Sequence, residues 1–325
     1  MPEPPRGAQA WIEEVRGARV QSLRALAGGA GARRYWRLQL DDGSRAVLMH
    51  ALAEDAEILP PALRATRDAL PFLEVGELLA RHAVPVPDVY AARRQERWVL
   101  LEDLGSIHLA DLSADERARR HGEAIDLLAR IHEIPRSDAL PFRRRFDREW
   151  VGFELGLFLE LVEPKPLRRT LEREFAELAD AIAALPSCLC LRDYQSHNLM
   201  IDPAGRLRVI DYQDALLAPP ELDLVALLWD SYVAIAPARR TALLERYAAL
   251  RGLAPAPDAL ALLGVQRKAK DYSRFERMVQ VKADARFSDA HANARTALLE
   301  HIEALPRGQS RLGRALRDAL ESLDS

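Results

Sequence analysis

One short segment constrains the fold more than any other part of the chain: two apolar runs, at 199–201 and 207–210, flank the turn sequence Asp-Pro-Ala-Gly. This pattern predicts a β-hairpin. Asn198 comes directly before the first run and Asp211 directly after the second, so the hairpin brings their side chains together. Asp193 lies five residues before Asn198, on the loop that leads into the hairpin. The fold must therefore gather three oxygen-bearing side chains at one end of a hairpin.

These three side chains match the requirements of phosphoryl transfer. In such a site one Asp accepts the proton of the attacking hydroxyl, while an Asn and a second Asp hold Mg²⁺ against the nucleotide phosphates. Mg²⁺ prefers oxygen ligands and takes few of them from the protein, so one amide and one carboxylate suffice. We predict that Asp193 is the catalytic residue and that Asn198 and Asp211 are the metal ligands. The structural alternative is that all three only cap turns and strand ends.

The first hundred residues carry strand signals. Two alternating runs, at 35–40 and 45–50, flank an Asp-Asp-Gly-Ser turn and predict a second hairpin. A helix is expected at 71–82, followed by a short strand at 89–90 and a clearer one at 98–101. The predicted order in this part is therefore strand, strand, helix, strand, strand.

From residue 105 onward the sequence is mostly helical. A Ser-Ala-Asp-Glu capping-box pattern opens a helix at 113–134, and amphipathic runs at 147–162 and 166–185 predict two more. Helical patterns then resume after the motif and continue to the C-terminus. We predict an α+β protein with a small antiparallel-sheet lobe over 1–104 and a larger, mostly helical lobe over 105–325.

The composition excludes several classes of protein. The 46 basic and 49 acidic residues give a net charge of −3, which provides no general attraction to nucleic acid or to anionic membranes. The N-terminus lacks the basic start and apolar core of a signal peptide, and the longest apolar segment, at 222–236, is too short to span a bilayer. Cys188 and Cys190 cannot form a disulfide framework or a closed zinc site by themselves. We expect a cytoplasmic monomer without nucleic-acid or membrane partners.

Together these segments resemble the aminoglycoside phosphotransferase and choline kinase-like family, which are kinases of small molecules with a protein-kinase-like two-lobe fold. Within this family the sequence resembles in particular the bacterial N-acetylmuramate/N-acetylglucosamine anomeric kinases of cell-wall recycling. The residues that carry the resemblance lie at 28–37, 72–74, 84–87, 100–105, 211–215, 223–230 and 264–267.

This resemblance implies ATP-dependent phosphorylation, with Mg²⁺ as cofactor, of the anomeric hydroxyl of N-acetylmuramate or N-acetylglucosamine in peptidoglycan recycling. It implies that the nucleotide binds to a glycine loop (Gly28, Gly29, Ala30 and Gly31) and to the two arginines that follow it, Arg33 and Arg34. It also implies nucleotide contacts at Met49, which takes the position of the usual strand lysine, and at a hinge made of Glu102, Asp103 and Leu104. It assigns the pocket for the small-molecule amino sugar to Asp214, Gln213, Glu154 and Arg192.

The sequence departs from the general kinase pattern at two positions. Leu191 stands where a histidine usually precedes the catalytic Asp by two residues. No lysine occurs before Lys165, so the first lobe lacks the strand lysine that many kinases use to bind phosphates. Arg33, Arg34 or Arg37 could supply that positive charge, because a guanidinium group binds phosphate through several donors.

Two other functions fit the same motifs. The first is an aminoglycoside or other small-alcohol phosphotransferase. Because an aminoglycoside is a polycation, its pocket would require several carboxylates, and the acidic positions available are Asp214, Glu221, Asp223 and Asp230. The second is a catalytically inactive nucleotide-binding module, which the replaced histidine and the missing lysine favour. The presence of all three motif residues argues against it, because an inactive module has no need of them.

Overall fold

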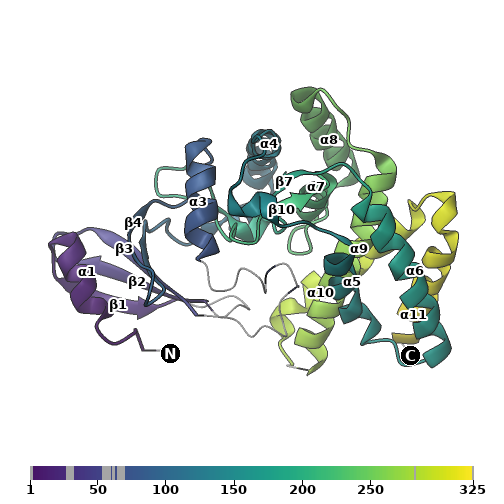
Figure 1. The fold of residues 1–325 in the computed structure, drawn as a ribbon, viewed down its shortest axis with the longest axis horizontal. Coiled ribbons are helices and arrows are strands. Elements are labelled where there is room, and N and C mark those ends of the chain that lie inside the picture. Colours follow the sequence, from purple (N-terminus) through teal and green to yellow (C-terminus); the bar gives the residue numbers. More distant parts are fainter. Residues whose placement is uncertain are drawn as a thin grey trace.

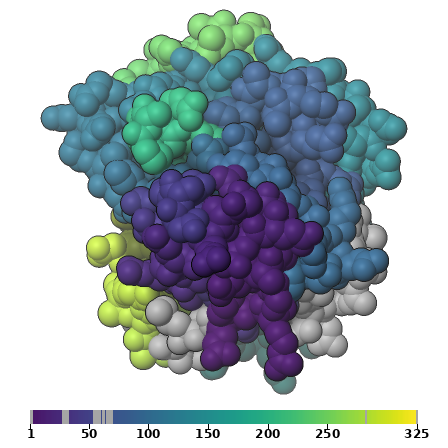
Figure 2. Space-filling model, turned by 90° about the vertical axis from the view of Figure 1, so that its left-hand side faces the viewer, coloured from purple at the N-terminus to yellow at the C-terminus, as the bar shows by residue number. Residues whose placement is uncertain are grey.

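The computed structural model describes residues 3–26, 33–52, 60, 63, 70–281 and 283–323. The chain forms a small sheet lobe at one end and a larger helical lobe at the other (Figure 1). Viewed from the sheet end, the N-terminal residues lie in front of the helical part (Figure 2). The predicted α+β, two-lobe architecture is confirmed. The glycine-loop residues Gly28, Gly29, Ala30 and Gly31 lie outside the described residues.

An antiparallel sheet of five strands forms the first lobe. Its strand order is β1 (Val20–Ala25), β2 (Arg33–Leu40), β3 (Arg45–Ala51), β5 (Trp98–Leu101) and β4 (Val89–Arg93). The predicted hairpin is β2–β3, in which Tyr35 lies opposite Met49. Gly43 in its turn has a φ of 82°, a conformation that glycine adopts without strain. The local turn signal was therefore sufficient to find this hairpin.

The sequence prediction omitted strand β1 and helix α1 (Ala8–Arg16). Strand β1 lies at the edge of the sheet, and none of its residues is fully buried. Its pairing with β2 also shifts register between Val20 and Ser22. An edge strand with a bulge shows only a weak alternation of apolar and polar residues, because only part of it faces the core.

The two faces of the sheet pack against different helices. Helix α1 covers the face that carries Trp36 and Leu48. Helix α3 (Pro71–Arg81) covers the other face, where Met49 and Val99 are fully buried. The core under α3 continues into the helical lobe, so the two lobes share one apolar interior. Met49, which occupies the position of the usual strand lysine, is thus part of this interior.

The helical lobe begins after the sheet and carries three more short strand pairings. Its helices are α4 (Ala114–His132), α5 (Arg148–Leu159), α6 (Lys165–Ala183), α7 (Glu221–Leu228), α8 (Pro237–Arg251), α9 (Pro257–Glu276), α10 (Ser288–Glu303) and α11 (Ser310–Leu323), with short 3₁₀ turns at Leu109–Asp111, Leu140–Arg143, Ser196–Asn198, Ala285–Phe287 and Arg307–Gln309 and a π-helical turn at Arg277–Val281. Its strands are β6 (Ile107–His108), β7 (Cys188–Cys190), β8 (Leu199–Ile201), β9 (Leu207–Val209) and β10 (Leu216–Ala218).

The predicted helices at 113–134, 147–162 and 166–185 are present as α4, α5 and α6. The capping interaction expected for α4 forms, because the Ser113 hydroxyl accepts a hydrogen bond from the backbone N–H of Glu116 at 3.3 Å. Across the described residues, none of the helices has the length and apolar character needed to cross a bilayer.

The two free cysteines lie on one face of β7, with their sulfur atoms 3.9 Å apart. His132 lies behind them, and its Nε2 is 3.8 Å from Cys190 Sγ. These three groups have metal-ligand chemistry, but two of them have other partners here. Cys190 donates to the carbonyl oxygen of Ala218, and His132 Nδ1 lies 2.6 Å from the Tyr247 hydroxyl. Cys190 packs as a small buried side chain, and Cys188 is half-buried beside it.

Arg208 on β9 connects the two lobes. It donates to both carboxylate oxygens of Glu102 at the end of the sheet, and it also donates to Asp202 Oδ2 at 3.1 Å. Gly105, with a φ of 82°, follows this hinge, and β6 then pairs with β8. The division of the chain at residue 104 stays a prediction.

Candidate active site

The β8–β9 hairpin places Asn198 beside Asp211. The backbone N–H of Ile210 donates to the carbonyl oxygen of Asn198 at 3.0 Å, which sets the next residue, Asp211, against Asn198. The Asn198 side chain donates through Nδ2 to the carbonyl oxygen of Asp193 at 2.8 Å. Because the amide nitrogen is used in this way, the amide oxygen is the atom left for a cation.

Asp193 lies among three cations. Its Oδ1 accepts a hydrogen bond from Arg267 at 2.8 Å and lies 3.7 Å from the Lys270 ammonium, and its Oδ2 lies 3.6 Å from Arg192. Burial raises the pKa of this carboxyl, but Lys270, Arg267 and Arg192 outweigh burial and hold the pKa well below its usual value. Asp193 is therefore an ionised carboxylate that can orient a hydroxyl group and accept its proton.

Two carboxylates in and after α7 anchor the loop that carries Asp193. Asp223 Oδ2 accepts the backbone N–H of Leu191 at 2.7 Å, and Asp230 Oδ2 accepts that of Ser196 at 2.7 Å. Both carboxylates are buried. These two hydrogen bonds fix the loop on each side of Asp193.

Two residues of the site have a left-handed backbone. Arg192 has a φ of 72° and Asp211 a φ of 60°, and such a conformation costs about 1–3 kcal/mol for a residue other than glycine. The carbonyl oxygen of Arg192 accepts a hydrogen bond from Arg267 at 2.7 Å, which helps to hold this conformation. Backbone strain of this kind clusters at functional sites, and here it occurs next to Asp193 and at Asp211.

Arg192 joins the two acidic residues that the sequence resemblance assigns to the sugar pocket. It donates to Glu154 Oε1 at 2.7 Å and to Asp214 Oδ2 at 3.3 Å. Glu154 is buried, and its Oε2 accepts from Gln266 at 2.7 Å. The Asp214 side chain is 28% exposed, and burial raises its pKa in spite of Arg192 and Arg33. Of the two acids, Asp214 is the one that a ligand can reach.

Arg33 extends from the sheet lobe to Asp211. Its guanidinium lies 2.7 Å from Asp211 Oδ1 and also donates to Gln213 Oε1. Arg34 is exposed, and because successive side chains of a strand point to opposite faces, it points away from Asp211. The structure thus distinguishes the two neighbouring arginines, which the sequence could not do: Arg33 contacts Asp211, and Arg34 does not.

The hinge side chains are held by neighbouring residues. Glu102 faces Arg208, and Asp103 Oδ1 accepts hydrogen bonds from Arg37 and from the backbone N–H of Gly105, both at 3.0 Å. Leu104 is buried. These contacts engage the Glu102 and Asp103 side chains within the protein.

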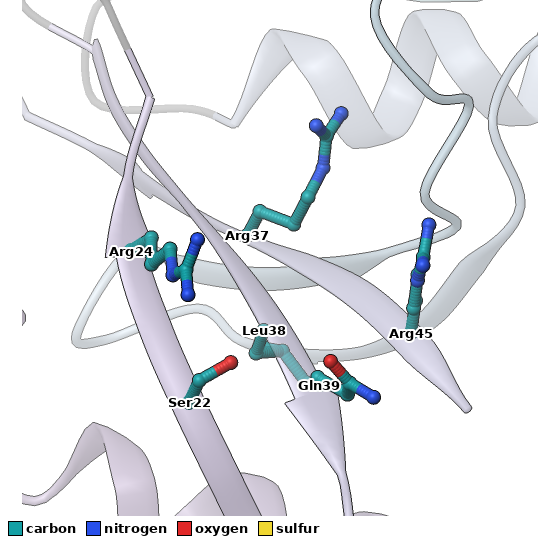
Figure 3. Close-up of a pocket in the computed structure, with 6 residues that line it drawn as sticks. All are labelled: Ser22, Arg24, Arg37, Leu38, Gln39 and Arg45. Carbon is teal, nitrogen blue, oxygen red and sulfur yellow. The ribbon is translucent and has the colours of Figure 1, made fainter. Parts of the chain in front are cut away.

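The sheet lobe also carries an open hollow of about 230 Å³ (Figure 3). Strands β1, β2 and β3 provide its lining, which consists of Ser22, Arg24, Arg37, Leu38, Gln39 and Arg45. The three arginines make the hollow basic, and Arg37 links it to the hinge through Asp103. None of its lining residues belongs to the cluster around Asp193.

Helix α9 supplies residues that the sequence prediction did not assign to the site. Gln266 contacts Glu154, Arg267 contacts Asp193, and Lys270 lies near both carboxylates. All three α9 side chains are buried. The available signal was a run of polar and charged residues at 266–271 directly after the apolar stretch at 259–265, because such residues need partners when the helix is buried.

The donor set around Asn198 and Asp211 fits Mg²⁺. Both offer oxygen atoms, which this hard cation prefers, and the Asp211 side chain remains 36% exposed. Arg33 places a positive charge on the same carboxylate in this structure. A bound Mg²⁺ would supply positive charge to nucleotide phosphates. Asn198 and Asp211 are the residues that would hold it.

The sequence profile of the phosphotransferase enzyme family matches residues 22–263, a range that includes Asp193, Asn198 and Asp211. The chain belongs to the phosphotransferase enzyme family. This family membership confirms the resemblance seen in the sequence, and the protein is accordingly a phosphotransferase.

Two relatives are N-acetylmuramate/N-acetylglucosamine kinases. That of Pseudomonas putida is 32% identical over 288 residues, covering 83% of this chain and 79% of the relative. That of Neisseria meningitidis is 31% identical over 291 residues, covering 82% of each chain.

Solved structures of the family share the fold. The choline kinase from Streptococcus pneumoniae superposes with a TM-score of 0.62 at 18% identity, covering 90% of this chain and 97% of its own. A spectinomycin phosphotransferase in complex with ADP and spectinomycin superposes with a TM-score of 0.61 at 12% identity, covering 90% and 95%. At these identities the likeness extends to the two-lobe fold.

Proposed function

We propose that this phosphotransferase transfers the γ-phosphoryl group of ATP, with Mg²⁺, to the anomeric hydroxyl of N-acetylmuramate or N-acetylglucosamine. The reaction would serve the recycling of peptidoglycan sugars in the cytoplasm, with the protein acting as a monomer. The observation that carries the proposal is the ionised Asp193 carboxylate, held by Arg267 in a chain that is 32% identical to a kinase of these two sugars.

Each site residue has a distinct role in this reaction. Asp193 orients the attacking hydroxyl and accepts its proton, while Asn198 and Asp211 hold the cation. Arg33 replaces the missing strand lysine as the positive charge from the sheet lobe. Asp214 accepts hydrogen bonds from sugar hydroxyls, because its side chain is accessible.

The other predicted site residues contact either the nucleotide or the sugar. The glycine loop at 28–31 and the hinge backbone at 102–104 bind the nucleotide. Gln213 shapes the sugar pocket, and Arg192 and the buried Glu154 support it from behind, because Arg192 connects Glu154 to Asp214.

The contacts of the acidic residues favour a sugar over a polycationic antibiotic. Asp223 and Asp230 accept backbone N–H groups of the Asp193 loop, and Glu221 accepts the backbone N–H of Ala256 at 3.1 Å. All three carboxylates are buried. Of the four acidic residues considered for an aminoglycoside pocket, only Asp214 therefore has a carboxylate that a ligand can reach. One carboxylate provides too little negative charge to bind a polycation.

The test is a comparison of acceptors. Purified protein with Mg²⁺ and ATP is offered N-acetylmuramate, N-acetylglucosamine and kanamycin, and the products are identified by mass and by phosphorus NMR. We expect phosphate on the anomeric oxygen of one or both sugars. Transfer to kanamycin alone would contradict the proposal, and no transfer to any acceptor would support an inactive nucleotide-binding module.

Arg33→Met should raise the KM for ATP about tenfold, because it removes a charge-assisted contact to phosphate, worth about 1.5–3 kcal/mol. The measurement is initial rate against ATP concentration at saturating sugar.

Arg34→Met is the matched control for this experiment. It removes the same charge from the neighbouring residue on the opposite face of β2, so its KM for ATP should stay within about twofold of the wild-type value, a difference of less than about 0.5 kcal/mol. Equal effects of the two substitutions would mean that only the net charge of the lobe matters, and that Arg33 has no specific role.

A further inference from the structure

Helix α9 concentrates positive charge behind Asp193. The chain has four lysines in all, and two of them, Lys268 and Lys270, are buried in one turn of α9 next to the buried Arg267. Burying an ammonium group costs several kcal/mol unless partners compensate it. Three adjacent buried cations on one helix therefore need to be explained by what they contact.

Two of these cations are fully engaged by the protein. Arg267 donates to Asp193, to Gln195 at 3.1 Å and to Asp271 at 3.2 Å. Lys268 donates to the Ser231 hydroxyl and to Asp271, both at 3.0 Å. Their hydrogen bonds account for their burial.

The third cation, Lys270, is different. Its nearest carboxylate oxygens are Asp193 Oδ1 at 3.7 Å and Asp271 Oδ1 at 3.8 Å, both beyond hydrogen-bonding distance. Its side chain is 7% exposed. Burial and Arg267 lower the pKa of Lys270, and Glu154 and Asp193 oppose them. The Lys270 ammonium thus has three N–H donors close to the catalytic carboxylate, but none of them forms a hydrogen bond with that carboxylate.

The position of Lys270 limits the kind of ligand that can satisfy these donors. A hydroxyl group oriented by Asp193 must lie within hydrogen-bonding distance of its carboxylate, and the phosphorus atom it attacks lies about 3–3.5 Å further on. The Lys270 ammonium lies 3.7 Å from the same carboxylate oxygen, so it and the attacking hydroxyl are neighbours of one carboxylate. The oxygen atoms of the transferred group carry the negative charge of the transition state, and a cation near the attacking hydroxyl can neutralise that charge.

We propose that Lys270 is a catalytic residue that donates hydrogen bonds to the phosphoryl group during its transfer. This inference rests on the proposed function. Arg33 contributes positive charge from the sheet lobe at Asp211, and Lys270 contributes it from the helical lobe at Asp193. Together they provide the positive charge that many kinases take from a strand lysine. Preorganised donors of this kind act on the transition state more than on bound ATP.

The test compares Lys270→Met and Lys270→Arg with the wild type on two acceptors. N-acetylmuramate has a carboxylate and N-acetylglucosamine has none. Lys270→Met should lower kcat about 10²–10³-fold on both acceptors alike, with the KM for ATP within about threefold, and Lys270→Arg should recover at least about tenfold of the loss. Lys270→Gln replaces the Met variant if the latter does not fold.

Two results would overturn this role. One is a kcat for Lys270→Met within about threefold of wild type, below the loss expected for a transition-state donor. The other is a loss confined to N-acetylmuramate and expressed in its KM, which would place the sugar carboxylate at Lys270 instead.

Failure of the proposed function is distinguishable from failure of Lys270. If the wild type phosphorylates neither sugar, the proposed function fails, and the variants are then compared for binding of ADP with Mg²⁺ and aluminium fluoride, a mimic of the transferred group that requires no sugar. At least tenfold weaker binding by Lys270→Met, with binding of ADP alone unchanged, supports the role of Lys270. Equal binding by the wild type and the variant overturns it.

Discussion

Asp193→Asn should lower kcat by about 10²–10⁴-fold, the usual contribution of a positioned general base. An amide has nearly the shape of a carboxylate but cannot accept the proton of the sugar hydroxyl. Asn198 and Asp211 are unchanged in this variant, so binding of Mg²⁺ and ATP should persist. The measurements are single-turnover phosphoryl transfer and calorimetric titration with a non-hydrolysable ATP analogue.

Asp214→Asn is a useful comparison, because it also removes a carboxylate that Arg192 contacts. It should raise the KM for the sugar while reducing kcat far less than Asp193→Asn does. Normal turnover by Asp193→Asn would show that another group accepts the proton.

Arg267→Met should shift the acid limb of the rate profile to higher pH. Burial raises the pKa of Asp193, and Lys270, Arg267 and Arg192 overcome that effect. Removing the closest of these cations, at 2.8 Å, therefore raises the pKa of Asp193 toward its ordinary value. The profile of kcat against pH measures this shift.

The same substitution changes the pH dependence of stability. Because the pKa of Asp193 is lower in the folded than in the unfolded protein, its ionisation stabilises the fold above the unfolded pKa, and this stabilisation is lost as pH falls through the folded pKa. In Arg267→Met the folded pKa is higher, so less stabilisation remains to be lost in acid. The free energy of unfolding in urea, measured at several pH values, should show a smaller decrease between neutral and acidic pH.

Arg274→Met is the matched control on the same helix. Arg274 is exposed and is the weakest of the cations that lower the pKa of Asp193. Its replacement should leave the acid limb nearly unchanged. A shift as large as that of Arg267→Met would mean that the overall charge of α9, and not contact with Asp193, sets the pKa.

Features with a local cause could be read from the sequence. The hairpins at 35–50 and 199–210 are encoded by their turns and by alternation over a few residues, and the start of α4 is encoded by a capping pattern. The juxtaposition of Asn198 and Asp211 follows from the second hairpin alone. Strand β1 escaped prediction because an edge strand lacks a strong pattern.

Features that depend on distant partners could not be read in this way. Asp223 and Asp230 have the sequence appearance of helix-capping or pocket acids, yet both bind the backbone of the Asp193 loop. Glu154 is assigned to the sugar pocket by the resemblance, an assignment that stays a prediction, and in the structure its carboxylate accepts hydrogen bonds from Trp150, Arg192 and Gln266. A carboxylate that binds a ligand and a carboxylate that holds a loop cannot be told apart in the sequence, because they differ only in their surroundings in the folded protein.

The sequence alone predicts the chemistry of this protein: one Asp, one Asn and a second Asp, at a spacing that a hairpin gathers and that is typical of phosphoryl transfer. The fold sets which cations lie at these residues. It selected Arg33 over Arg34 by the alternation of β2, and it brought Arg267 to Asp193 from 74 residues away. The strength of an electrostatic interaction depends on the distance between the two charges in space. For Arg267 and Asp193 this distance is set by the packing of α9 against the Asp193 loop, and no local sequence pattern encodes that packing.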